Sequence, residues 1–325
     1  MKEMAERDLV RQLDQAVDAM LSNAGPAPAG PEVTELLRIA ADLRVLPDEE
    51  FRASLKSELM NRATQERQTM TTTAKHVRAE VNSLMPYLLP QNAAGLIDFM
   101  KQVFGAEEIA RYPRPDGSIM HAAVRINDSV IEMGEPQGEY KPAPAALHLY
   151  VEDVDAVYQR AVEAGATTLH ALVDQEYGDR EASIRDPFGN NWYVATHKGP
   201  RHVPEGLRAV TPYLHPRGTP ALIDFLKRGL GAVEAERYES PDGTVVHAKI
   251  KIGDSMVEMG EAHGEWQPMP GALHLYVEDV DASYKRAIEA GATSLSAPSD
   301  KPYGERSAGV VDPAGNQWYL AKHIG

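Results

Sequence analysis

The greater part of the 325-residue chain is one sequence written twice. Residues 84 to 199 align with residues 210 to 325 at a constant offset of 126 without a gap, and 65 of the 116 aligned positions are identical. Such a repeat requires one fold to be built twice, so any ligand or catalytic site is expected in two copies. The longest shared segments are PYL (86–88, 212–214), LIDF (96–99, 222–225), PDG (115–117, 241–243), EMGE (132–135, 258–261), ALHLYVEDVDA (146–156, 272–282) and NxWY (190–193, 316–319).

The length and the repeat together predict three regions. These are a helical N-terminal extension and linker over 1–80, a first domain over 81–200 and a second domain over 206–325. Apolar residues of the N-terminal extension recur at helical spacing, and no chemistry-bearing motif accompanies them. The extension is expected to be a small helical bundle or a docking arm, followed by a polar linker.

Composition excludes several classes of function. The formal net charge is −15 without a basic stripe, so nucleic acid and anionic membranes would be repelled. The chain has no cysteine, which excludes disulfides, thiolate catalysis and zinc–cysteine sites. The first residues lack the apolar core of a signal peptide, and no run approaches about 18 apolar residues. A cytoplasmic protein is expected.

Hydrophobic periodicity predicts the same order of elements twice in each repeat: one strand, one helix and three strands. In the first repeat, helices are expected over 93–104, ended by Gly105, and over 154–164, capped by Asp153 and ended by Gly165. Strands are expected near 85–89, 107–113, 118–126, 129–134, 147–151, 167–171, 180–185 and 191–196.

This order, together with the motifs, resembles the glyoxalase/bleomycin-resistance/dioxygenase group, also called the vicinal oxygen chelate superfamily. The resemblance covers residues 82 to 325 and includes RYxxPDG, YVEDVDAxYxRAxEAGA, YGxR and DPxGNxWY in sequence. It implies an α+β fold of two tandem vicinal-oxygen-chelate domains. Each domain would join two βαβββ modules into an open half-barrel, with a ligand cleft on the concave face and helices on the convex face.

Several shared motifs have a structural explanation. In DPxGN (186–190), aspartate, proline and glycine are the residues of a tight hairpin turn. Glu152 and Asp153 stand where a strand passes into a helix, so a carboxylate cap explains them. Arg180 and Arg306 are expected in buried salt bridges, with a clamp for a substrate anion as the alternative.

The period of the strands sorts side chains by face. Ile131 and Met133 should lie under a helix, whereas Glu132 should face the cleft with Ala123 opposite it. By the same alternation, Leu147 and Leu149 lie toward the helix. The predicted ligand-binding residues are His121, His148, Tyr150 and Tyr193, their counterparts His247, His274, Tyr276 and Tyr319, and His215, which has no histidine counterpart.

The resemblance also locates the metal-ligand positions of the superfamily. In the first repeat these are Met85, Glu132, Ala146 and Tyr193, and in the second Thr211, Glu258, Ala272 and Tyr319. Only the glutamate can bind a metal well in each set, and a catalytic divalent ion needs about three protein ligands. The usual metal site is therefore expected to be lost, and no cofactor is the first expectation.

A displaced site stays open as an alternative. His148 lies two residues beyond a lost ligand position on the same face, so His121, Glu132 and His148, with counterparts His247, Glu258 and His274, could bind iron, nickel, manganese or zinc. Alternatively, these side chains form a hydrogen-bonded network in a ligand pocket. In the second repeat, Lys249 is expected to form an ion pair with Glu258, which would neutralise that carboxylate.

Two classes of function follow. In the first, each cleft binds a small organic molecule without transforming it. In the second, the protein is a metal-dependent or acid/base lyase, isomerase or dioxygenase, with Glu132 and Glu258 as bases and His148, Tyr193 or Tyr319 as acids. A further alternative is that only one copy is active, marked by Leu89/His215 and Ala123/Lys249. Either a monomer or a homodimer is compatible with the sequence.

Overall fold

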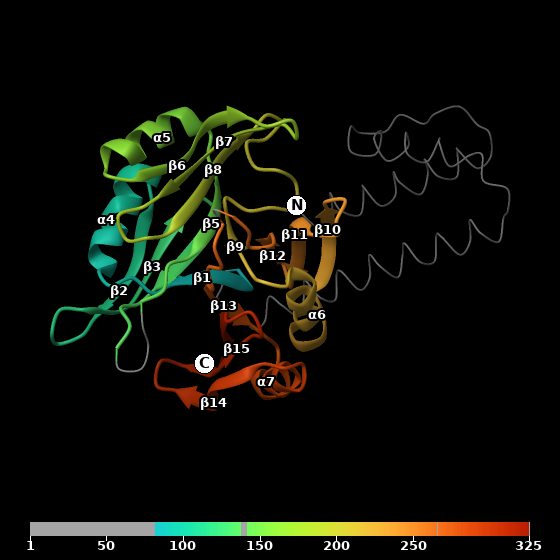
Figure 1. The fold of residues 1–325 in the computed structure, drawn as a ribbon. Coiled ribbons are helices and arrows are strands. Elements are labelled where there is room, and N and C mark those ends of the chain that lie inside the picture. Colours follow the sequence, from blue (N-terminus) through green and yellow to red (C-terminus); the bar gives the residue numbers. More distant parts are fainter. Residues whose placement is uncertain (1–81, 138–141, 265, 325) are drawn as a thin grey trace, which may run out of the picture. The chain divides into compact units, whose positions relative to one another are not determined.

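The computed structural model describes residues 82–137, 142–264 and 266–324. The prediction of helices over residues 1–80 lies outside these ranges and stays a prediction. Figure 1 shows the described elements in sequence colours.

Each repeat contains the predicted order of one strand, one helix and three strands, twice. The first repeat has β1 (Leu84–Leu88), α4 (Ala93–Phe104), β2 (Glu107–Pro113), β3 (Ile119–Ile126), β4 (Ser129–Met133), β5 (Ala146–Tyr150), α5 (Val154–Glu163), β6 (Thr167–Asp174), β7 (Asp179–Arg185) and β8 (Asn191–His197). The second has β9 (Val210–Leu214), α6 (Thr219–Leu230), β10 (Val233–Glu239), β11 (Val245–Ile252), β12 (Ser255–Met259), β13 (Ala272–Tyr276), α7 (Val280–Glu289), β14 (Thr293–Lys301), β15 (Glu305–Val311) and β16 (Gln317–His323).

The helix boundaries follow from local hydrogen bonds. The side chain of Asn92 accepts from the amide of Gly95 at the start of α4, and Gly105 ends that helix at φ 69°. Asp153 caps α5 by accepting from the amide of Ala156, as predicted. At α6 the cap is Gly218, so the carboxylate of Glu261 accepts from the first amides instead.

The described strands form two eight-stranded sheets, and each sheet contains strands of both repeats. Sheet 1 has the order β14-β15-β16-β13-β1-β4-β3-β2, and sheet 2 has the order β10-β11-β12-β9-β5-β8-β7-β6. Each half-barrel of two modules therefore combines the first module of one repeat with the second module of the other. The contacts across the joint are the antiparallel pairs β1 with β13 and β5 with β9.

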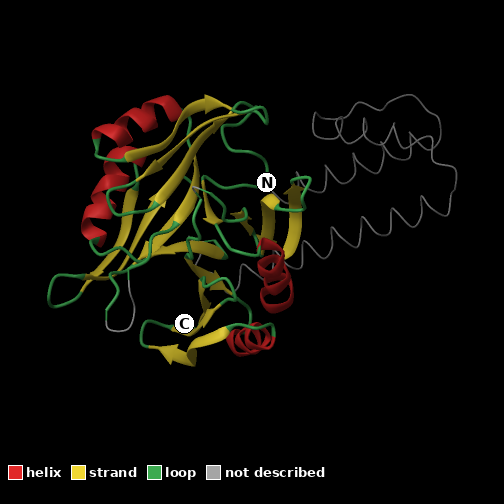
Figure 2. Cartoon of the chain, in the orientation of Figure 1, coloured by secondary structure: helices red, strands yellow, loops and turns green. Residues whose placement is uncertain are grey.

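The two large hydrophobic cores, in contrast, each belong almost entirely to one repeat. One core collects α4, α5 and strands of the first repeat, including Leu96, Ile131, Met133 and Trp192, with Val210 added. The second core does the same for the second repeat, with Leu84 added. The red helices in Figure 2 cover the faces of the strands that carry these residues. Each repeat is thus held by its core, and the two repeats are joined through their sheets.

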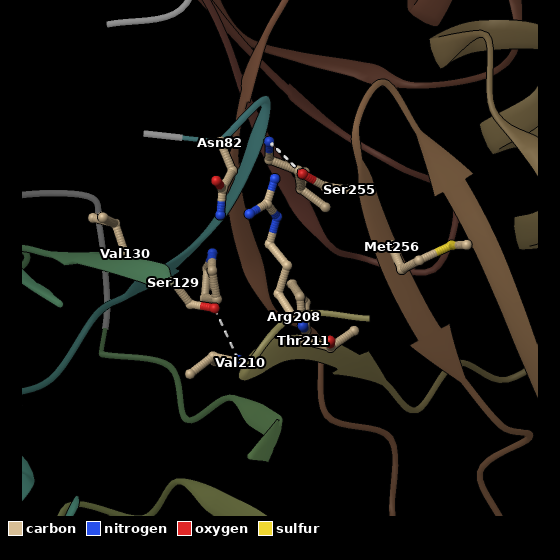
Figure 3. Close-up of a pocket in the computed structure, with 11 residues that line it drawn as sticks. Asn82, Ser129, Val130, Arg208, Val210, Thr211, Ser255 and Met256 are labelled. Carbon is tan, nitrogen blue, oxygen red and sulfur yellow. Dashed lines mark hydrogen bonds between the residues drawn. The ribbon is translucent and has the colours of Figure 1, made fainter. Parts of the chain in front are cut away.

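Two symmetric clamps hold the first strand of each repeat. Asp254 and Ser255, which open β12, accept from the amides of Ser83 and Leu84 at 3.0 and 3.4 Å. Their counterparts Asp128 and Ser129 each accept, at 2.9 Å, from the amides at the start of β9. Figure 3 shows Ser129 and Ser255 of the clamps, with Arg208 and Val210, around a cavity of about 10 Å³, which has room for no more than one water molecule.

The contacts of the DPxGN turn and of Arg180 test the structural roles predicted for them. Asp186 accepts hydrogen bonds from two turn amides, from the side chain of Asn190 and, at 2.9 Å, from the indole of Trp192. The structural role of DPxGN is therefore confirmed. Arg180 makes a bidentate ion pair with Asp155, but its side chain is 32% exposed, so the prediction of a buried salt bridge was wrong in that respect.

Candidate functional site

The predicted ligand-binding residues lie on the inner face of the sheets, which we define as the face opposite the helices. Ile131, Met133, Leu147 and Leu149 lie in the core under the helices, and the residues that alternate with them face the other side. The predicted pairing of Ala123 with Glu132 is confirmed.

The Glu258 site, on the inner face of sheet 2, centres on a fully buried carboxylate. Glu258 is 1% exposed, and its Oε2 lies 2.8 Å from Nδ1 of His148. On its other side, Oε1 lies 3.7 Å from Nε2 of His247, whose Nδ1 is 3.5 Å from the hydroxyl of Tyr213. The site therefore joins β12, β5, β11 and β9.

The Glu132 site repeats this arrangement on the inner face of sheet 1. The carboxylate of Glu132 is 5% exposed and lies 2.5 Å from Nδ1 of His274 and 4.0 Å from Nε2 of His121. Tyr87 and Tyr319 pack edge to face beside them, with ring centroids 5.2 Å apart. Both sites thus present a glutamate between two histidines.

The prediction that His121, Glu132 and His148 lie together was wrong in its third member. Glu132 contacts His274, whereas His148 contacts Glu258 on the other sheet. The physical reason is the exchange of modules, because β4 shares a sheet with β13 rather than with β5. Each site accordingly takes its two histidines from different repeats.

The predicted ion pair between Lys249 and Glu258 was also wrong. The two residues are partners in the register of β11 and β12, but the ammonium group of Lys249 lies 3.0 Å from Glu236 on β10. The carboxylate of Glu258 instead contacts His148.

The charges of the Glu258 site are coupled. Burial alone would lower the pKa of His148, but the charge of Glu258 and the hydrogen bond to it outweigh burial and raise that pKa. Burial likewise opposes ionisation of Glu258, yet His148 lowers the pKa of this carboxyl group. Both shifts favour an imidazolium next to a carboxylate. Burial lowers the pKa of His247, which favours its neutral form.

Tyrosines surround the two sites and remain protonated. Burial raises the pKa of Tyr87, Tyr193 and Tyr213 above the ordinary value. The hydroxyl groups of Tyr150 and Tyr276 donate to the buried carboxylates of Asp179 and Glu305, at 3.0 and 2.7 Å. These two tyrosines therefore already have partners within their sheets.

In an aromatic group beside the Glu258 site, Tyr193 and His215 were predicted from the sequence, whereas Tyr213 and Trp266 were missed. Nε2 of His215 lies 2.6 Å from the hydroxyl of Tyr193, and the ring of Trp266 is nearly parallel to that of His215, with centroids 5.6 Å apart. Alternation along the PYL strand would have placed Tyr87 and Tyr213 on the inner face. Trp266 lies in the segment between β12 and β13, where no periodic signal exists.

The residues present do not fit the divalent metal that the superfamily implies. The register places Met85, Ala272, Glu132 and Tyr319 on sheet 1, so one carboxylate is accompanied by a thioether, a methyl group and a phenol. Among the residues that the structure describes, no group of three or more His, Asp or Glu side chains is disposed to hold a metal ion. A cavity of about 200 Å³ lined by Arg114, Glu135 and Gln91 shares no lining residue with either site.

Comparison with known proteins defines the class. The sequence model described as Glyoxalase/Bleomycin resistance protein/Dioxygenase superfamily matches residues 81–194 and 217–320. The chain therefore belongs to this superfamily. Glyoxalase I from Zea mays has the same fold, with a TM-score of 0.56 at 17% identity over 74% of this chain and 92% of that chain.

Two curated relatives have a higher sequence identity to this chain, over a smaller part of it. An uncharacterized protein of Mycobacterium tuberculosis is 42% identical over 121 residues, covering 34% of this chain and 71% of the relative. "Putative glyoxylase CFP32" of Mycobacterium bovis is 26% identical over 217 residues, covering 62% of this chain and 80% of the relative. No helix within the described ranges is long and apolar enough to cross a membrane.

Proposed function

We propose that the chain binds a small organic molecule on the inner face of each sheet, with the glutamate–histidine pair as the polar anchor. The observation that carries this proposal is the pairing of Glu258 with His148 and of Glu132 with His274, each across two repeats. Burying such a pair gains little stability compared with apolar side chains. Ionisable groups that are buried together outside the core are typical of functional sites.

The surroundings support an organic ligand with an oxygen function. Tyrosine rings offer apolar area beside each pair, and an imidazole can donate to a carbonyl, carboxylate or hydroxyl oxygen. Membership of the superfamily supports the same conclusion, because its members typically bind small molecules.

The test is a thermal-shift screen with small carboxylic acids, dicarbonyl compounds and phenols, each in large excess. A ligand of the native state raises the unfolding temperature in proportion to the logarithm of its concentration. We expect at least one compound class to stabilise the wild-type protein and to lose its effect in the double variant His148→Gln/His274→Gln. A screen in which no compound stabilises the wild-type protein would contradict the proposal.

A second candidate function is proton transfer to a bound carbonyl compound. It is favoured by Nε2 of His148, which is buried without a hydrogen-bond partner while Glu258 orients Nδ1. A histidine held in this way can donate a proton from Nε2 as a general acid. The assay is isomerisation of the hemithioacetal of methylglyoxal and glutathione, which His148→Gln should abolish. Wild-type protein without turnover would exclude this substrate.

A further inference from the structure

The inner face of sheet 2 carries two buried imidazole nitrogens without a hydrogen-bond partner, Nε2 of His148 and Nδ1 of His215. Their residues are 8% and 7% exposed. The other two unpartnered buried side-chain atoms recorded for the described residues belong to Arg208 and Thr219. An unpartnered buried polar atom destabilises a fold, so two on one face point to another molecule that supplies their partners.

Both nitrogens are hydrogen-bond donors. The carboxylate of Glu258 favours the imidazolium form of His148, in which Nε2 carries a proton. Burial lowers the pKa of His215 to about 4, so this imidazole is neutral. The phenol of Tyr193 stays protonated and donates a hydrogen bond to Nε2 of His215 at 2.6 Å. This leaves the ring proton of His215 on Nδ1.

The two donors are separated along one face. His148 is opposite Thr211 in the register of β5 and β9, and His215 follows Thr211 by four residues, with Tyr213 between them on the same face. At about 3.3 Å per residue, the backbone positions of Thr211 and His215 are about 13 Å apart along the strand direction. A partner of both donors must therefore be elongated.

Aromatic rings line the distance between the donors. Tyr193 and Tyr213 meet edge to face with centroids 5.0 Å apart, and Trp266 meets Tyr193 at 5.4 Å in the same way. Trp192 and Trp318 are fully buried in the cores, whereas Trp266 is half-buried. Flat rings at such angles favour a planar aromatic partner over an aliphatic one.

We propose that the inner face of sheet 2 is specialised for a planar aromatic molecule with an acceptor oxygen at each end. Its rings pack against Tyr193, Tyr213 and Trp266, and its oxygens accept from His148 and His215. This inference rests on the proposed function and names the ligand class of one of its two sites. Sheet 1 differs, because Leu89 stands at the position of His215.

The probe is 4-hydroxycinnamate, which is planar and has a phenol at one end and a carboxylate at the other. Its nonaromatic control is 3-(4-hydroxycyclohexyl)propanoate. Isothermal titration calorimetry on the full chain should give one tight site per chain for the probe and at least about tenfold weaker binding for the control.

The duplication offers matched variants. His215→Leu introduces the residue that the first repeat has, and it should weaken binding of the probe at least about tenfold, as should Trp266→Ala at a half-buried position. Leu89→His, on the other sheet, should leave this site unchanged. Circular dichroism and the unfolding temperature establish that each variant is folded.

The outcomes separate the two proposals. Unchanged affinity in both His215→Leu and Trp266→Ala, two equal sites for the probe, or no binding of the probe would overturn the specialisation of sheet 2. If other compounds of the thermal-shift screen still bind, the proposed function stands without this specialisation. If no compound binds, both fail.

Discussion

Glu258 shows how a carboxylate can be fully buried and still ionised. Transfer of one charge into the interior is expensive, and removing one partner of a buried pair leaves the other uncompensated. Here His148 provides the opposite charge, with its Nδ1 2.8 Å from Oε2 of Glu258. Nε2 of His247 lies 3.7 Å from the other carboxylate oxygen. The pair should therefore make the stability of the protein depend on pH.

We expect Glu258→Gln to remove a stabilisation of about 1–3 kcal/mol that the wild type has near pH 5.5. The raised pKa of His148 contributes stability below the ordinary value of 6.5, which is lost as pH rises through its folded pKa. The lowered pKa of Glu258 contributes above the ordinary value of 4.5, and this is lost as pH falls. Urea unfolding from about pH 4 to 8 measures the difference between wild type and variant.

Glu181 and Asp179 also raise the pKa of His148, so part of the pH dependence survives the substitution. Parallel stability curves for wild type and Glu258→Gln over this range would show that the pair does not carry the effect. Glu132→Gln is the matched variant on sheet 1, where Glu132 contacts His274.

Asp186→Ala tests a buried residue with a purely structural role. Asp186 is 3% exposed and accepts four hydrogen bonds, including the one from Trp192. Its removal leaves buried donors without an acceptor, so we expect a loss of about 2–4 kcal/mol in the free energy of unfolding. Asp312→Ala should behave in the same way, because Asp312 repeats these contacts. A loss below about 0.5 kcal/mol in both variants would contradict this role.

The turns before β4 and β12 show how two equivalent segments come to tolerate different residues. Asn127 has φ 51° and Gly253 has φ 60°, so both adopt the left-handed conformation. A Cβ atom added at Gly253 would lie 2.8 Å from Oγ of Ser83, in the clamp that holds β1. Glycine is therefore required at position 253 by the closeness of Ser83 as well as by the left-handed backbone conformation.

We expect Gly253→Ala to destabilise the protein by about 1–2 kcal/mol, since the left-handed conformation and the contact with Ser83 both oppose a side chain. Asn127→Gly is the control, and it should change stability by less than about 1 kcal/mol. Thermal unfolding followed by circular dichroism measures both variants. Equal effects of the two substitutions would mean that the clamp does not restrict this position.

Local signals predicted the elements well, but they did not predict which modules share a sheet. Alternation placed Glu132 and His148 on inner faces, and caps and glycines gave the helix boundaries. The segments Ala146–Tyr150 and Ala272–Tyr276 have the same sequence, so their side chains do not decide which of them pairs with β1. The choice between them depends on long-range packing of each repeat's own core, which periodicity does not contain. For this reason the faces of the site residues were predicted and their partners were not.

The exchange of modules has a consequence for each repeat taken alone. In residues 82–203, β1 would lose its antiparallel partner β13, and β5 would lose β9. Each open edge would expose unpaired backbone groups, which favour pairing with another chain. A second copy can satisfy both edges, because its β5 has the same sequence as β13 and its Asp128 and Ser129 can replace Asp254 and Ser255 of the clamp.

We therefore expect residues 82–203, produced alone, to form a homodimer with two complete sheets. Light scattering after size exclusion should give twice the mass of the fragment, and its unfolding temperature should rise with protein concentration, because dimerisation is coupled to folding. Replacing Leu84 of β1 by proline should weaken the dimer, since proline removes the amide that donates to the serine of the clamp. Residues 206–325 provide the matched second fragment. A monomeric fragment with cooperative unfolding that is independent of concentration over about a hundredfold range would show that one repeat can close its own sheet.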